Sequence, residues 1–72
     1  MSRPIFIFET THHALWAEEI AREQRIPHEI VPAPSESNAR CDIAIETLPD
    51  SVAGMTDAFD GAGVEFRVFI AR

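Results

Sequence analysis

The sequence predicts an α+β domain in which two helices cover one face of a four-stranded antiparallel sheet. Two observations support this class. Apolar residues alternate or run together over four short stretches, as in strands, and recur at helical spacing over two longer ones. These stretches follow one another as strand, helix, strand, strand, helix, strand. The 72 residues are enough for one domain, which we expect to span residues 1–72.

The first strand and the first helix are predicted near the start of the chain. Pro4 to Phe8 is continuously apolar, which is typical of a central strand with both faces covered. Thr10 or Thr11 can cap the following helix, because a threonine hydroxyl accepts a hydrogen bond from an unpaired backbone N–H. The apolar stripe runs to about Gln24, and Pro27 prevents the helix from continuing.

The middle of the chain predicts a strand, a loop and a second strand. His28 to Val31 lies between two prolines, so we expect a short edge strand with His28 in contact with solvent. Pro32 to Arg40 has the composition of a loop. Cys41 to Glu46 alternates in polarity and predicts the third strand.

The last third predicts a helix and a closing strand. Pro49 fits the first turn of a helix, and either Gly61 or Gly63 can end it in the left-handed conformation. Val64 to Ile70 alternates as a last strand. The complete order is the βαββαβ pattern of the ferredoxin-like sandwich.

Composition and charge exclude several classes of function. The net charge of -6 argues against binding to nucleic acid or to an anionic membrane, since both require a basic surface. The start of the chain shows no signal peptide, and the one cysteine cannot form an internal disulfide, so we expect a cytoplasmic protein with a free thiol. No glycine-rich phosphate loop or catalytic triad is recognisable, and we expect neither a cofactor nor an enzyme.

The predicted topology brings the cysteine to the first helix. The first and third strands are antiparallel neighbours in this fold, so the start of the third lies beside the end of the first. Cys41 should therefore lie near the start of the helix, together with Thr10, Thr11, His12 and His13. The positive end of a helix lowers the pKa of a nearby thiol, and a histidine there can exchange a proton with it. Arg40 would support the thiolate, and Asp42 would oppose it.

The segments "FETTHHALWAEE", "IVPAP" and "CDIAI" resemble, in this order, the selenium/sulfur carrier protein-like family. The resemblance covers nearly the whole chain, and the matching residues are Phe8, Thr10, Thr11, His12, His13, Ala14, Leu15, Ala17, Glu18, Pro32, Pro34 and Cys41. It implies that Cys41 holds sulfur or selenium as a persulfide or perselenide, received from a donor protein. Two positions depart from the family pattern: Asp42 replaces a usual glycine, and Arg25 stands where a helix-ending glycine is common.

The residues also allow other functions. An inert, buried Cys41 is common among free cysteines, and one histidine can cap the helix while the other packs. A metal chaperone or sensor using Cys41 with a histidine is a third class, although the chain has no CxxC motif.

The side of the sheet away from the helices predicts a non-catalytic alternative. Either Ile5 and Ile7 or Phe6 and Phe8 must lie on this open face, joined by Phe69 and Ala44. An exposed apolar patch of that size marks an interaction site. We therefore expect a homodimer, or a binding module, that uses the open face.

Overall fold

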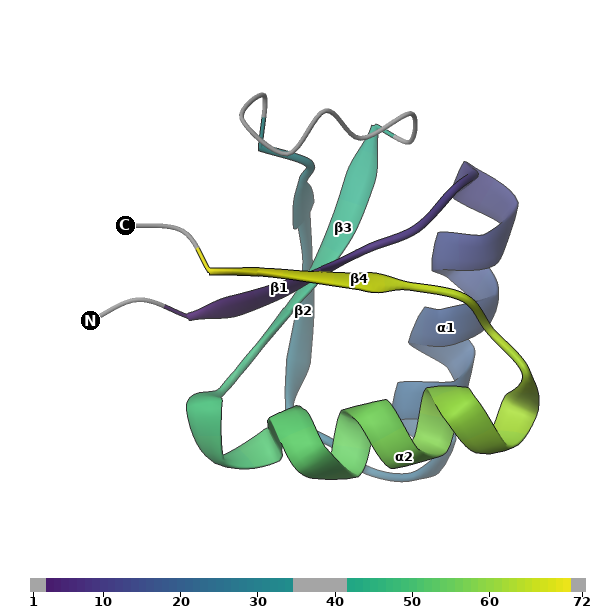
Figure 1. Cartoon of the computed structure of the whole chain (residues 1–72), viewed down its shortest axis with the longest axis vertical. Helices are drawn as coiled ribbons and strands as arrows, with labels where there is room; N and C mark the ends of the chain where they lie inside the picture. Colours follow the sequence, from purple (N-terminus) through teal and green to yellow (C-terminus); the bar gives the residue numbers. More distant parts are fainter. Residues whose placement is uncertain (1–2, 35–41, 71–72) are drawn as a thin grey trace.

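The computed structural model describes residues 3–34 and 42–70 and forms one sheet with two helices (Figure 1). In chain order the elements are β1 (Pro4–Ile7), α1 (Thr11–Glu23), β2 (His28–Pro32), β3 (Ile43–Thr47), the 3-10 turn η2 (Pro49–Ser51), α2 (Val52–Ala62) and β4 (Arg67–Ile70). The strand order is β2-β3-β1-β4, and each neighbouring pair is antiparallel. The predicted ferredoxin-like order is confirmed.

The last strand is shorter than predicted because its first residues serve the end of α2. Gly63 ends this helix with a φ of 82°, which selects Gly63 over Gly61 as the left-handed residue. The backbone N–H of Val64 donates to the carbonyl oxygen of Phe59 at 3.0 Å, and the Val64 side chain is buried. Val64 therefore closes the helix, and β4 begins only at Arg67.

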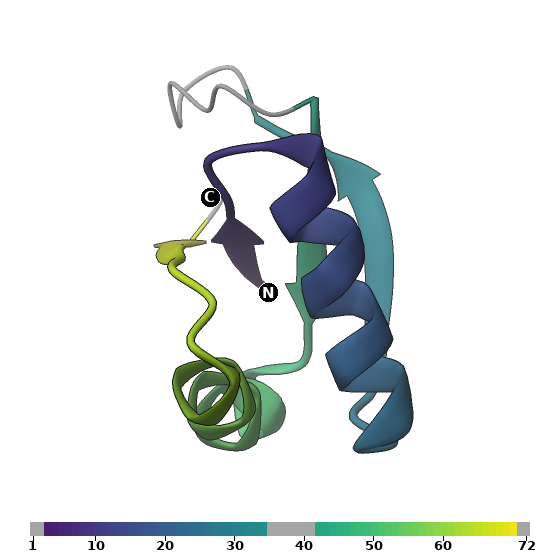
Figure 2. The ribbon, with the colours of Figure 1, turned by 90° about the vertical axis from the view of Figure 1, so that its right-hand side faces the viewer.

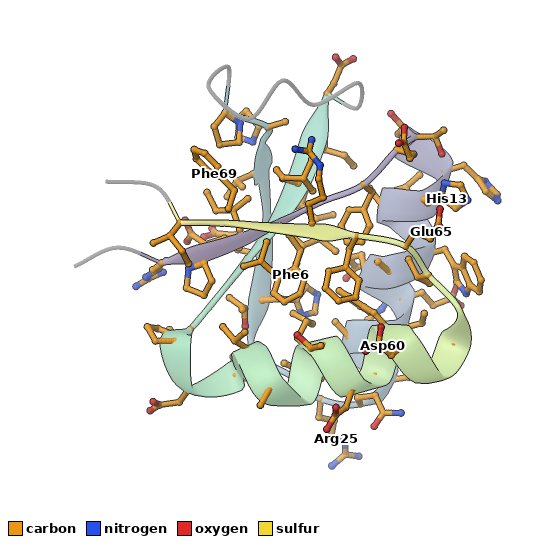
Figure 3. All side chains as sticks on the ribbon, in the orientation of Figure 1. Phe6, His13, Arg25, Asp60, Glu65 and Phe69 are labelled. Atoms are coloured by element: carbon orange, nitrogen blue, oxygen red, sulfur yellow. The ribbon has the colours of Figure 1, made fainter. Side chains whose placement is uncertain are left out.

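Both helices pack on the same face of the sheet, where they form the main core. Phe6 of β1 and Phe8, directly after that strand, meet Phe59 of α2 with ring centroids 5.4 and 5.6 Å apart, and the ring of Phe66 lies 5.2 Å from that of Phe6. The helix α1 contributes buried residues at helical spacing, namely Ala14, Ala17, Ile20 and Ala21. Figure 3 shows Phe6 on the helix side of the sheet and Phe69 on the other side.

The open face carries the predicted residues but is less exposed than predicted. The register pairs Ile5 with Phe69, so the two side chains share a face, and Ile5, Ile7 and Ala44 form a second buried cluster with Phe69 packed against it. Ile5 is only 6% exposed and Ile7 only 2%. The expected exposed patch is therefore wrong for these residues, because their apolar surface is already buried within one chain.

Candidate functional site

Thr10 caps helix α1 and thereby shapes its first turn. Its backbone is extended, and its Oγ1 accepts a hydrogen bond from the backbone N–H of His13 at 3.1 Å. The same oxygen lies 3.1 Å from Nδ1 of the His13 ring. The prediction left a choice between Thr10 and Thr11, and the structure selects Thr10 as the cap and Thr11 as the first helical residue.

Three aromatic rings follow one another along the exposed side of this turn. The ring centroids of His12 and His13 are 6.2 Å apart, and those of His13 and Trp16 are 6.5 Å apart. His12 is exposed, His13 is half-buried, and Trp16 is 40% exposed. Trp16 was not predicted to belong to this group. The i, i+3 spacing from His13 to Trp16 is the signal that could have found it.

The start of β3 lies beside the start of α1, as both Figure 1 and Figure 2 show. The cause is the antiparallel pairing of β1 with β3, in which Phe6 stands opposite Ile45. This register brings the end of β1, which leads into α1, toward the beginning of β3. Asp42, directly before β3, is exposed, and its carbonyl oxygen accepts a hydrogen bond from the N–H of Ala33 at 3.0 Å.

The structure describes most but not all of the predicted site residues. It brings Thr10 and His13 into contact and places Thr11 and His12 on the same turn. It places Asp42 at the neighbouring strand start. Cys41 and Arg40 lie outside the described residues, so the predicted contact between the thiol and the helix stays a prediction.

His28 has a different environment from the one predicted. It does not face solvent freely: its Nε2 lies 2.8 Å from Oε2 of Glu18 on α1, and its Nδ1 lies 2.7 Å from the carbonyl oxygen of Ile26. Only 15% of the side chain is exposed. The prediction of a solvated His28 was wrong because α1 lies over this part of β2 and buries the ring.

Within residues 3–34 and 42–70, no three His, Cys, Asp or Glu side chains lie close enough together to hold a metal ion. In the same part of the chain, no helix has the length and apolar character that crossing a membrane requires.

The strand order, the antiparallel pairing and the capped helix start together define a ferredoxin-like α+β domain with a polar site at one end of the sheet. A protein-family model described as "Putative Se/S carrier protein-like" matches residues 3–70, which is nearly the whole chain. The chain therefore belongs to this family, as the sequence resemblance implied. Searches of curated proteins and of solved structures returned no match.

Proposed function

We propose that the chain carries a sulfur or selenium atom on the thiol of Cys41, as a persulfide or perselenide, and receives it from a donor protein. The family description, which names a carrier of these two elements, supports the proposal. We further propose that it does so in the cytoplasm, where thiols stay reduced.

The observation that supports the proposal is that the start of β3 lies beside the start of α1. Cys41 directly precedes Asp42 in the sequence. Asp42 leads into β3, whose start lies beside the first turn of α1. A thiolate near that turn would be stabilised by the positive end of the helix. The exposed carboxylate of Asp42 would act against this effect.

His13 is the proposed proton acceptor for the thiol. In the tautomer that this role requires, Nδ1–H of His13 donates to the Thr10 oxygen 3.1 Å away, and the lone pair of Nε2 is available to accept the proton of the thiol. His12, on the same turn and exposed to solvent, is the second candidate.

The transfer step would proceed without a net change of oxidation state. The Cys41 thiolate attacks the outer sulfur of a persulfide on the donor cysteine. The S–S bond of the donor breaks, a new S–S bond forms on Cys41, and the donor leaves as a thiolate. The proton that Cys41 lost passes from the histidine to the departing thiolate.

Mass spectrometry of the intact protein after incubation with a persulfide-loaded cysteine desulfurase tests the proposal. We expect a mass increase of one sulfur atom, which dithiothreitol reverses and Cys41→Ser abolishes. His13→Ala should slow the loading without preventing it. An unchanged mass, together with an alkylation rate of Cys41 that follows pH like an ordinary thiol, would overturn the proposal.

A binding or dimerisation module is the second candidate, and one observation favours it. The exposed large apolar residues of the described chain include two on the edge strand β4, Val68 and Ile70. Self-association through the open face, in contrast, would find Ile5 and Ile7 already buried. Under this candidate, Cys41→Ser leaves self-association intact, and sedimentation analysis of that variant measures it.

A further inference from the structure

The two edges of the sheet differ in how well they are protected. The strand order makes β2 one edge and β4 the other. An edge strand presents unpaired backbone groups that can pair with another chain, and proteins commonly guard it with proline, charged residues or a covering element.

The β2 edge carries several of these guards. Ala33 donates to the carbonyl oxygen of Asp42, which makes this a hydrogen-bonded pair, so in the alternating ladder Pro32 turns its nitrogen outward, away from β3. A proline nitrogen has no hydrogen to donate. At the other end of the strand, the contact of His28 with Glu18 fixes α1 against β2. A second chain therefore meets an interrupted edge here.

The β4 edge, Arg67–Ile70, carries one charged residue, Arg67, at its first position. The rest of the strand, Val68–Ile70, contains no proline and no charged residue. Figure 1 draws it in front of β1, and Figure 2, from a perpendicular direction, shows it at the outer side of the sheet. Val68 and Ile70 are 43% and 51% exposed, although the residues opposite them on β1, Phe6 and Pro4, are buried.

We propose that the β4 edge pairs with the β4 edge of a second copy of this chain and joins the two sheets into one. A strand related to itself by a twofold axis is its own antiparallel partner, so the pairing is self-complementary. A strand that pairs with β4 must present apolar side chains on both faces of the sheet. The reason is that Val68 and Ile70 of β4 lie on the helix face and Phe69 lies on the open face. β4 itself meets that condition.

The side chains select one register. When Phe69 lies opposite Phe69 of the second copy, Val68 lies opposite Ile70 of the second copy on the helix face. The exposed apolar residues of both chains then cover one another, and the two open-face clusters become continuous through Phe69. If the register between the two β4 strands shifted by one residue, Val68 of one copy and Val68 of the other would lie on opposite faces of the joined sheet.

Sedimentation velocity of the full chain tests the pairing with a closely matched control. Val68→Lys places a charge on the β4 edge, whereas Ile30→Lys places the same charge on the β2 edge, at a residue 44% exposed and on the same face of the sheet. We expect the unmodified chain and Ile30→Lys to form dimers and Val68→Lys to remain a monomer. Circular dichroism confirms that each variant is folded, and Ile70→Lys replaces Val68→Lys if the latter unfolds.

Three results would overturn the proposal. They are a monomeric unmodified chain in the high micromolar range, a dimer that Val68→Lys leaves intact, and a dimer that Ile30→Lys disrupts equally. The inference is independent of the proposed function of Cys41, because neither lysine lies at the start of α1. If the Val68→Lys variant is a monomer and still gains a persulfide on Cys41, the carrier function does not depend on the pairing of the β4 edges, and the two proposals are tested separately.

Discussion

At the scale of single residues, Thr10 performs two tasks with one oxygen. It satisfies the backbone N–H of His13, which would otherwise have no partner at a helix start, and it contacts Nδ1 of the same residue. The stability of the helix and the orientation of the candidate proton acceptor therefore depend on the same hydroxyl.

Replacing this hydroxyl should affect stability measurably. We expect Thr10→Ala to lower the free energy of unfolding by about 1 kcal/mol, the usual cost of losing an N-cap. Thr10→Ser keeps the oxygen and should restore most of the loss. Urea denaturation followed by circular dichroism measures both variants, and equal stabilities of the alanine and serine variants would contradict the assigned cap.

Arg25 and Gly63 hold equivalent places at the ends of the two helices. Both have positive φ angles, 57° and 82°, and each is followed by an apolar residue whose N–H bonds back into the helix. Ile26 donates to Ala21 at 2.9 Å, and Val64 donates to Phe59 at 3.0 Å. An arginine in the left-handed conformation is strained by its Cβ, whereas a glycine is not.

Substitutions at these two places should have opposite effects. Arg25→Gly should raise the free energy of unfolding by about 0.5–1 kcal/mol, because it relieves the strain. Gly63→Ala should lower it by about 1 kcal/mol, because it introduces the same strain. Thermal denaturation of the two variants beside the unmodified chain measures both shifts. A lower midpoint for Arg25→Gly would show that the arginine side chain makes a compensating contact.

At the scale of elements, the contact between Glu18 and His28 attaches α1 to β2. Both side chains are largely buried, with 20% and 15% exposed, and the 2.8 Å contact bridges elements that pack face to face. Arg22, one turn further along α1, lies 3.4 Å from the other oxygen of Glu18.

Removing the carboxylate should weaken this attachment. Glu18→Ala removes the partner of a ring nitrogen in the largely buried side chain of His28, so we expect a loss of about 1–3 kcal/mol in the free energy of unfolding. The neighbouring Glu19 is exposed, and Glu19→Ala is the control, with a change within about 0.5 kcal/mol. Urea denaturation distinguishes the two. Equal losses of stability in Glu18→Ala and Glu19→Ala would mean that the contact between Glu18 and His28 does not contribute to the free energy of unfolding.

The elements were largely predictable because their signals are local. Apolar spacing located both helices and all four strands, and the two prolines around His28–Val31 marked an edge strand. The burial of His28 was not predictable, because it depends on how α1 crosses β2, which is a property of the packed molecule. The same limit applies to Ile5 and Ile7, whose apolar character predicted an exposed patch although they are buried. At the start of α1 the helix cap was predictable as Thr10 or Thr11, the ring contact of His13 with Trp16 was missed, and the contact with Cys41 stays a prediction.

At the scale of the whole molecule, net charge opposes self-association. Each chain carries a formal charge of -6, so two copies repel one another at low ionic strength. The strand β4 has no acidic residue, which keeps this repulsion away from the proposed contact itself.

Salt should therefore strengthen the proposed dimer. Because added ions screen the repulsion between the two chains, we expect the dissociation constant to fall as the ionic strength rises from low values to the physiological range. Sedimentation equilibrium across a salt series measures this dependence. A dissociation constant that rises with salt would indicate an interface held by ion pairs instead of apolar side chains.

The ring contact between His13 and Trp16 gives the molecule an optical probe of its own. The chain contains one tryptophan and no tyrosine, so almost all of its intrinsic emission arises from Trp16. The indole lies next to His13 and remains 40% exposed. A partner that covers the first turn of α1, or an atom loaded nearby, would change the intensity or wavelength of that emission, and events at this end of the sheet can be followed in unlabelled protein.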